Sequence, residues 1–134
     1  MASRYDIFYQ PQGDINWKEV LFPDEQLHAI PKEIGVYRFV CFKLEKWITL
    51  FVDVSEREPC ETLRSSYQFH NNQSKNDTSQ LYELYSTENV QFEHYSCTIN
   101  EAKRHKNNLL IKESPKYNSI RLTFNLNQGE KAFQ

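Results

Sequence analysis

The stretch from Thr98 to Asn118, TINEAKRHKNNLLIKESPKYN, constrains the fold more than any other part of the chain. Thr98 and Glu101 have the spacing of a capping box, in which each side chain accepts a hydrogen bond from the backbone N–H group of the other at a helix start. The helix ends at Ser114-Pro115, because proline disfavours helical geometry in the residue before it. These signals predict a single helix between them.

The core-facing stripe of this predicted helix contains one charged residue. The stripe recurs at three- and four-residue steps, the spacing of one helix face, and consists of Ile99, Ala102, Lys106, Leu109 and Leu110. A buried or half-buried ammonium group costs several kcal/mol of folding free energy unless another group pairs with it. Lys106 therefore either extends along the helix surface to solvent or faces a polar cleft.

The middle of the chain predicts a hairpin, two helices and a further strand. Residues 34–42 and 47–54 are rich in β-branched and aromatic side chains, and the short link between them favours an antiparallel hairpin. A helix is expected to begin at Glu58-Pro59, with Cys60, Leu63 and Tyr67 on one face and His70 on the same face about a turn farther on. A solvated loop over 70–79 follows, then a short helix around Leu81, Leu84 and Tyr85 and a strand from Val90 to Ser96.

The two ends of the chain add possible strands to this core. Tyr5, Ile7 and Tyr9 alternate with polar neighbours, as do Ile120, Leu122, Phe124 and Leu126. Residues 15–33 are interpreted as a loop or short turn of helix packed by its aromatic side chains. The predicted fold class is α+β, in one domain: a central antiparallel sheet of three strands flanked by about three helices, with possible extra N- and C-terminal strands. Residues 1–33 are the N-terminal strand and lead-in, 34–118 the core, and 119–134 the C-terminal strand and tail.

Composition narrows the compartment and the class of partner. The cysteines are odd in number and never form a C-x-x-C pair, so neither a disulfide framework nor a zinc site is expected, and a reducing compartment fits: Cys41, Cys60 and Cys97. A signal peptide and a membrane span are both absent from the sequence pattern, which predicts a cytoplasmic protein without membrane partners. The net charge of −2 is unusual for a protein bound to nucleic acid, although the last third has a basic bias.

Four short motifs, in order, resemble those of the GIY-YIG nucleases, including the N-terminal domain of the excision-repair endonuclease subunit. Lys106 to Asn118 resembles the last catalytic segment of that family. Gly35-Val36-Tyr37 resembles the first half of the family name, and residues 51–55, FVDVS, stand where the second half would fall. Residues 63–67, LRSSY, resemble the helix that carries the family arginine. The resemblance spans about residues 34 to 118 and implies a small GIY-YIG-like domain.

The resemblance implies metal-dependent cleavage of DNA, but three family positions are substituted. Tyr37, Arg64 and Asn118 remain as family catalytic positions, although aligning the Ser-Ser-Tyr run places the family arginine at Leu63. Phe51 replaces the second family tyrosine, and Asp53 replaces the glycine. Lys106 replaces the glutamate that binds the metal in the family, and an ammonium group has donors but no acceptor for a cation.

Two functions of different classes follow. The first is a catalytically degenerate binding module without metal or cofactor, whose partner is DNA, RNA or a protein. The residues expected to bind nucleic acid in this hypothesis are Arg64, Lys103, Arg104, Lys106 and Lys116. The alternative is an active endonuclease in which Mg²⁺ or Mn²⁺ is held by a displaced ligand, with Asp53, Glu101 and Glu113 as candidates.

Each candidate residue also has a purely structural interpretation. Tyr37 fits a core strand through its ring alone, Arg64 can pair with Glu61, and Asn118 can hydrogen-bond backbone at the helix exit. His70 and His105 are acid or base candidates by type, with surface placement as the default. His94 and Cys97 have the spacing of part of a metal site, but two ligands do not make one.

Overall fold

The computed structural model describes residues 15–23, 27–56 and 61–118 and has the predicted α+β class. The described residues form four strands and four helical segments. In order they are β1 (Lys18–Leu21), the 3₁₀ turn η1 (Leu27–Ala29), β2 (Gly35–Lys43), β3 (Lys46–Ser55), α2 (Leu63–Gln73), α3 (Tyr82–Tyr85), β4 (Val90–Ser96) and α4 (Ile99–Glu113). The predicted hairpin, short helix, further strand and long terminal helix are all confirmed.

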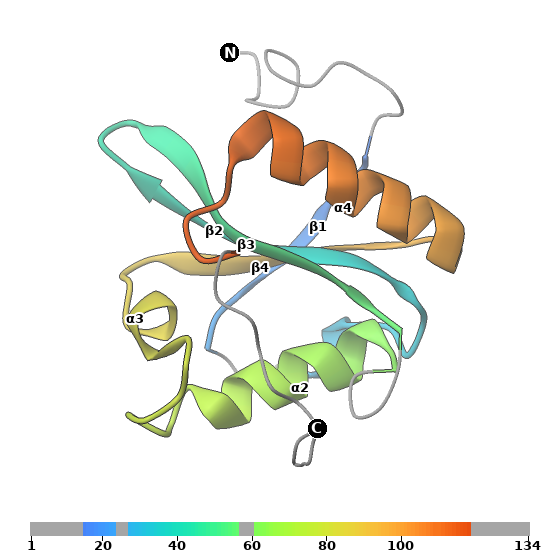
Figure 1. The fold of residues 1–134 in the computed structure, drawn as a ribbon. Coiled ribbons are helices and arrows are strands. Elements are labelled where there is room, and N and C mark those ends of the chain that lie inside the picture. The colour runs from blue at the N-terminus through green and yellow to red at the C-terminus, as the bar shows by residue number, and fades with distance from the viewer. Residues whose placement is uncertain (1–14, 24–26, 57–60, 119–134) are drawn as a thin grey trace.

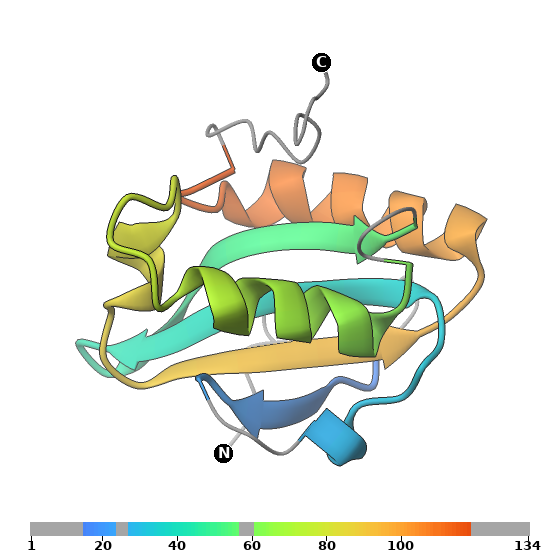
Figure 2. The ribbon, with the colours of Figure 1, turned by 90° about the horizontal axis from the view of Figure 1, so that it is seen from below.

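All four strands form one antiparallel sheet in the order β1-β4-β2-β3, which Figure 2 shows from the side of α2. Strand β1 pairs with β4, Lys18 opposite His94. This strand lies inside residues 15–33, so the interpretation of that stretch as loop and helical turn is correct for η1 and wrong for β1. Four residues carry too weak an alternation to be distinguished from a loop, and the pairing edge of β4 decides their conformation.

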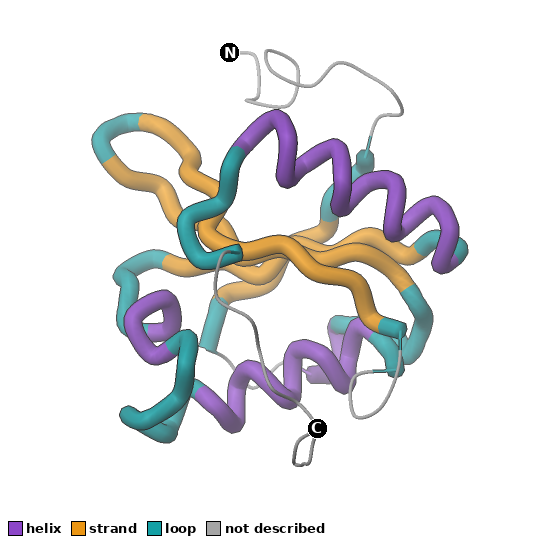
Figure 3. Tube along the Cα trace, in the orientation of Figure 1, coloured by secondary structure: helices purple, strands orange, loops and turns teal. Residues whose placement is uncertain are grey.

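The sheet has a helical layer on each face (Figures 1 and 3). Helix α4 covers one face, and the core between this helix and the sheet is made of small aliphatic side chains: Val36, Val52, Val54, Ala102 and Leu109. Helices α2 and α3 cover the other face, where the core is mostly aromatic, with Tyr37, Phe39, Phe51, Tyr67, Tyr85 and Phe92 among its members. Because alternate residues of a strand point to opposite faces, β2 contributes to both cores.

Gly35 begins β2 where two backbones approach closely. A Cβ atom at this position would stand 2.1 Å from the carbonyl oxygen of Tyr95 and 2.9 Å from Cδ1 of Leu63. The backbone N–H of Gly35 donates to Ser55 Oγ at 3.0 Å, and that hydroxyl donates back to the Gly35 carbonyl at 3.3 Å. Glycine therefore allows β4 and α2 to pack against the start of β2.

The hairpin that joins β2 and β3 has an unusual turn. Leu44 and Glu45 both lie in the left-handed region, with φ of 55° and 62°. A two-residue hairpin loop requires this conformation at both positions, but asparagine and glycine adopt it at much lower cost than leucine. Figures 1 and 3 show that this hairpin extends beyond the two helical layers.

Helix α2 is displaced along the chain from its predicted position. It begins after Thr62, whose side chain and Ser65 form a capping box, and not at Glu58-Pro59. It also continues to Gln73, so the expected loop over 70–79 begins later than predicted. The shared face is confirmed for Leu63, Tyr67 and His70, all of which are buried, while Cys60 lies outside the described residues. A Thr-x-x-Ser capping box supplies both backbone partners that the Pro signal does not.

Helix α4 agrees with its sequence signals at both ends. Thr98 and Glu101 form the reciprocal capping box, and Ser114 ends the helix in the left-handed conformation with φ of 43°. Among the described residues, no helix has the length and apolar character needed to cross a membrane. The predicted terminal strands at Tyr5 to Tyr9 and Ile120 to Leu126 lie outside the described residues.

Candidate functional site

Tyr37 lies on β2, an inner strand of the sheet, and its side chain contacts α2. Its side chain is buried, and its hydroxyl is 2.9 Å from Nε2 of His70. The other ring nitrogen of His70, Nδ1, is 2.7 Å from the hydroxyl of Tyr85. Strand β2 and helices α2 and α3 thus join through one buried Tyr-His-Tyr chain of hydrogen bonds.

This Tyr-His-Tyr chain of hydrogen bonds carries no charge. Burial lowers the pKa of His70 from 6.5 to about 3, because the charged imidazolium would lose its hydration in the aromatic core. A neutral imidazole has one donor and one acceptor nitrogen, so one of the two tyrosines accepts a hydrogen bond and the other donates one. The default surface placement of His70 is therefore wrong. The residue lies on the apolar stripe of α2, and its hydrogen-bond partners come from distant parts of the sequence.

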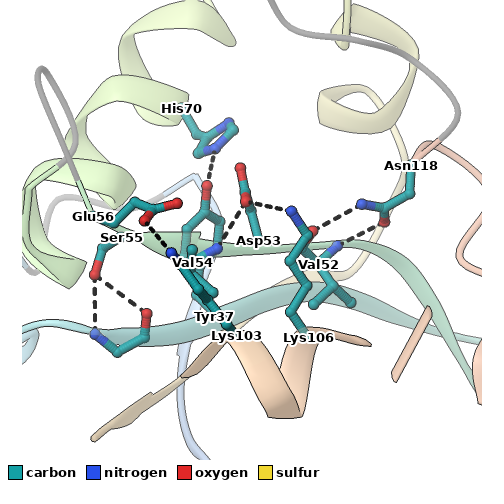
Figure 4. Close-up of polar contacts among 11 residues, drawn as sticks. Tyr37, Val52, Asp53, Val54, Ser55, Glu56, His70, Lys103, Lys106 and Asn118 are labelled. Carbon is teal, nitrogen blue, oxygen red and sulfur yellow. Dashed lines mark hydrogen bonds and ion pairs between the residues drawn. The ribbon is translucent and has the colours of Figure 1, made fainter. Parts of the chain in front are cut away.

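Lys106 reaches from α4 to the outer edge of the sheet, where it pairs with Asp53 of β3 (Figure 4). Its Nζ is 3.1 Å from Asp53 Oδ1, and the two side chains are 31% and 23% exposed. The same carboxylate oxygen accepts the backbone N–H of Val54 at 2.8 Å. The charge within the apolar stripe is thus accommodated by a carboxylate on the neighbouring edge strand.

Asn118 binds the same edge. Its side-chain oxygen accepts the backbone N–H of Val52 at 2.9 Å, and its side-chain nitrogen donates to the Val52 carbonyl at 2.8 Å (Figure 4). The preceding residue, Tyr117, donates its backbone N–H to the Leu50 carbonyl at 2.9 Å. The amide therefore replaces a neighbouring strand on an edge that would otherwise leave polar backbone groups unpaired.

Arg64 lies elsewhere. Its Nε donates to the Ile30 carbonyl at 2.6 Å and its Nη2 to the His28 carbonyl at 3.3 Å, so the guanidinium group holds the segment around η1. Leu63, the other candidate for the family arginine position, is fully buried. The pairing proposed for Arg64 with Glu61 is replaced by these two backbone contacts.

The structure thus brings together four of the positions singled out from the sequence. Asp53 is the register partner of Tyr37 on the adjacent strand, Lys106 pairs with Asp53, and Asn118 binds the residue next to Asp53. Phe51, at the second family tyrosine position, is buried with its ring centroid 5.8 Å from that of His70. Arg64 does not join this group.

The remaining basic candidates are distributed over separate surfaces. Lys103 is 55% exposed and pairs with Glu56 at 3.3 Å. Arg104 is exposed on α4, and exposed Lys116 has its Nζ 5.2 Å from the ring centroid of Tyr117. Two of the five predicted phosphate-binding cations, Lys103 and Lys106, are therefore already neutralised by carboxylates.

The three alternative metal ligands each have another partner. Asp53 pairs with Lys106, Glu101 accepts from Thr98 at the helix cap, and Glu113 accepts from Arg38. The hydrogen bond from the Thr98 backbone lowers the pKa of the Glu101 carboxyl. Within residues 15–23, 27–56 and 61–118, no group of three or more His, Cys, Asp and Glu side chains could hold a metal ion. His105 is buried and not at the surface, with its ring centroid 5.8 Å from that of Tyr95.

A buried ionic cluster on the α4 face was missed by the sequence reasoning. Arg38 is fully buried, and its Nε is 2.7 Å from Glu93 Oε1 while its Nη1 is 3.2 Å from Glu113 Oε1. Thr49 donates its hydroxyl to the same Glu113 oxygen, and the guanidinium carbon lies 4.3 Å from the ring centroid of Trp17. The sequence signal that could have predicted this cluster is Arg38 itself, a charged residue in the middle of a β-branched and aromatic strand.

Comparison with protein-family models, with curated proteins and with solved structures found no match. The chain is therefore described by its own geometry: a layered α+β fold whose β3 edge carries an ion pair and an asparagine clamp.

Proposed function

We propose that this chain is a metal-independent binding module of GIY-YIG-like layout, which binds nucleic acid or a protein partner without cutting it. The observation that carries the proposal is the ion pair between Lys106 and Asp53. In the family that the sequence resembles, the position of Lys106 supplies the anionic ligand of the metal.

The local electrostatics support a site without metal. An ammonium group 3.1 Å from the nearest carboxylate repels a divalent cation and has no lone pair to offer one. The hydroxyl of Tyr37 is buried against neutral His70, away from the solvent that a hydrolytic reaction would use. The group at the β3 edge thus has the layout of a reaction site with its charges already satisfied.

The alternative of an active endonuclease with a displaced metal ligand has weaker support. Glu101 and Glu113 serve opposite ends of α4, one in the helix cap and the other in the Arg38 cluster. Recruiting either one to a metal beside Asp53 would remove a partner that the fold already uses. Asp53 would also lose its ion pair with Lys106 if it bound a metal ion.

Incubation with single-stranded, duplex and branched DNA in Mg²⁺ and in Mn²⁺ tests the absence of catalysis. We expect no metal-dependent cleavage. Cleavage that requires the metal and disappears in Tyr37→Phe would overturn the proposal and favour the endonuclease. The matched control for that variant is Tyr82→Phe, since Tyr82 is 41% exposed on α3.

Substitution of the cation provides a second test. Lys106→Glu places a carboxylate beside Asp53, so we expect measurable Mn²⁺ binding by calorimetry where the natural protein shows none. Lys103→Glu is the matched control, because it makes the same charge change beside Glu56 on the exposed part of the same helix. Equal Mn²⁺ binding by the natural protein and Lys106→Glu would show that Lys106 does not exclude the metal.

A salt series separates the two classes of partner. Binding of DNA or RNA that weakens steeply with salt would assign the module to nucleic acid, since counterion release dominates such complexes. Failure to bind any DNA or RNA even at low salt would leave a protein as the partner.

A further inference from the structure

The hairpin tip, residues 42–47, has several features that the fold itself does not require. Leu44 is 83% exposed and Phe42 is 49% exposed at the end of a hairpin that extends beyond both helical layers (Figures 1 and 3). Leu44 and Glu45 adopt left-handed φ angles, which cost about 1–2 kcal/mol for each non-glycine residue. Local departures of this kind concentrate where a surface serves binding.

The aromatic pair of the tip lies on the α4 face of the sheet. Phe42 and Trp47 are register partners, and their ring centroids are 5.3 Å apart in an edge-to-face arrangement. Thr49, two residues along β3 and therefore on the same face, donates to Glu113 in the last turn of α4. The two rings thus form an apolar platform just beyond the C-terminal end of that helix.

The charge around the hairpin tip is positive. Lys43 and Lys46 are exposed and stand directly opposite one another across the hairpin, on the other face from the two rings, and such a pair of like charges destabilises a strand pair. Lys112, in the last turn of α4, is also exposed. Against these three lysines the tip has one acidic residue, Glu45, whereas the whole chain has a net charge of −2.

We propose that the hairpin tip binds single-stranded nucleic acid, with bases stacked on Phe42 and Trp47 on one face and phosphates contacted by Lys43 and Lys46 where the strand passes over the tip to the other face. Every base has a π face, so such a platform is sequence-tolerant, and the flexible lysine stems let the ammonium groups follow the backbone. Leu44 supplies an apolar contact to an unstacked base. A regular duplex keeps its bases stacked on each other and cannot use the platform.

This inference rests on the proposed binding function and assigns it a partner and a surface away from the β3 edge. The test uses the full chain with fluorescently labelled oligothymidylate and oligouridylate strands of about twelve nucleotides, and a duplex of the same length. We expect anisotropy to show that both single strands bind more tightly than the duplex. Quenching of tryptophan fluorescence on binding is expected to disappear in Trp47→Phe.

Two pairs of matched variants locate the surface. Phe42→Ser is expected to weaken single-strand binding about tenfold, whereas Leu21→Ser, which changes a 60% exposed residue of β1, leaves it unchanged. The double variant Lys43→Glu, Lys46→Glu is expected to reduce the slope of log K against log salt by about 1.4, because two phosphate contacts are lost. Lys32→Glu, Lys75→Glu makes the same charge change at exposed residues elsewhere and should keep the slope.

Three results would overturn the inference: no binding of either single strand at low salt, equal or tighter binding of the duplex, or unchanged binding in the tip variants. The first result excludes single-stranded nucleic acid as the partner of the tip. The last leaves the proposed binding function intact and moves the surface. Metal-dependent cleavage would overturn the absence of catalysis in the proposed function, while binding of single strands by the tip is measured separately. Urea unfolding of each variant confirms that the compared proteins are folded.

Discussion

The two faces of the sheet accommodate buried polar groups in opposite ways. Under α2 and α3, Tyr37, His70 and Tyr85 form a neutral chain of hydrogen bonds within an aromatic core. Under α4, Arg38 and its carboxylate partner Glu93 form an ionic cluster beside small aliphatic side chains. Consecutive residues of β2, Tyr37 and Arg38, point into these two environments.

This difference determines how much folding free energy is lost when one partner of a buried polar group is removed. A neutral chain of hydrogen bonds contains no charge, so truncation of one member leaves only an uncharged polar group without its partner, at a cost of about 1–2 kcal/mol. A buried ion pair that loses one member leaves a charge without its partner, which is far more costly. The two faces should therefore respond differently to substitution and to pH.

The largest expected effect comes from the ionic face. Arg38→Met should lower the free energy of unfolding by about 3–5 kcal/mol, because Glu93 and Glu113 lose their cation. Urea unfolding measures the change. Arg64→Met is the matched control and should cost about 1–2 kcal/mol, since that guanidinium group contacts backbone carbonyls in a half-buried position. Equal losses would erase the distinction between the two kinds of site.

The second-largest expected effect is destabilisation of the protein by acid, through buried His70. The pKa of His70 is about 3 in the folded protein and 6.5 in its ordinary range, so below pH 6.5 the unfolded chain takes up a proton that the folded chain does not. Stability should therefore fall by about 1.4 kcal/mol for each pH unit between these values. Burial lowers the pKa of His94 to about 4, which adds to the loss with the same sign.

Urea midpoints measured from neutral pH down to about pH 4.5 check this dependence. His70→Gln should flatten the profile, whereas His28→Gln, at an exposed residue of η1, should leave it unchanged. An identical slope in His70→Gln and the natural protein would contradict the assignment of the acid sensitivity to His70.

Removal of a single hydroxyl from the neutral face should have a smaller effect. Tyr37→Phe and Tyr85→Phe each delete one partner of His70 and should cost about 1–2 kcal/mol. Thermal or urea unfolding provides the comparison, with Tyr82→Phe as a control expected to be neutral. A loss as large as that of Arg38→Met would show that the neutral chain is as sensitive as the ionic cluster.

The smallest expected effect is a gain in stability, at the hairpin turn between β2 and β3. Leu44→Asn with Glu45→Gly supplies residues suited to left-handed φ and should stabilise the protein by about 1 kcal/mol. The same double variant should weaken binding of single-stranded nucleic acid, because it removes the exposed leucine. A more stable protein with unchanged binding would separate the strain of the turn from the function proposed for the tip.

Much of the fold was predictable because its signals are local. The capping box at Thr98, the Pro115 stop and the β-branched and aromatic runs on both sides of Lys43 to Lys46 each depend on residues close in the sequence. Strand β1 was not predictable in the same way, because its four residues become a strand by pairing with β4. The start of α2 was predicted too early, because Thr62 and Ser65 form a stronger cap than the Pro59 signal suggested.

The candidate site was predictable in part. The stripe of α4 identified Lys106 as an exception, and the structure supplies Asp53 as its partner from a strand that is distant in the sequence. Asn118 was expected to bind backbone, and the structure identifies that backbone as Val52. Arg64 was assigned to phosphate, but its fork is used by the carbonyls of Ile30 and His28.

The sequence by itself determined the α+β class, the hairpin, the ends of α4 and the presence of a cation in an otherwise apolar stripe, since periodicity and caps act over a few residues. Only the tertiary structure decided the partners of the polar side chains: Lys106 with Asp53, His70 between two tyrosines, and Arg38 with two glutamates. The physical reason is that the free energy of a buried charge depends on the groups that packing brings to it, and those groups come from distant parts of the chain.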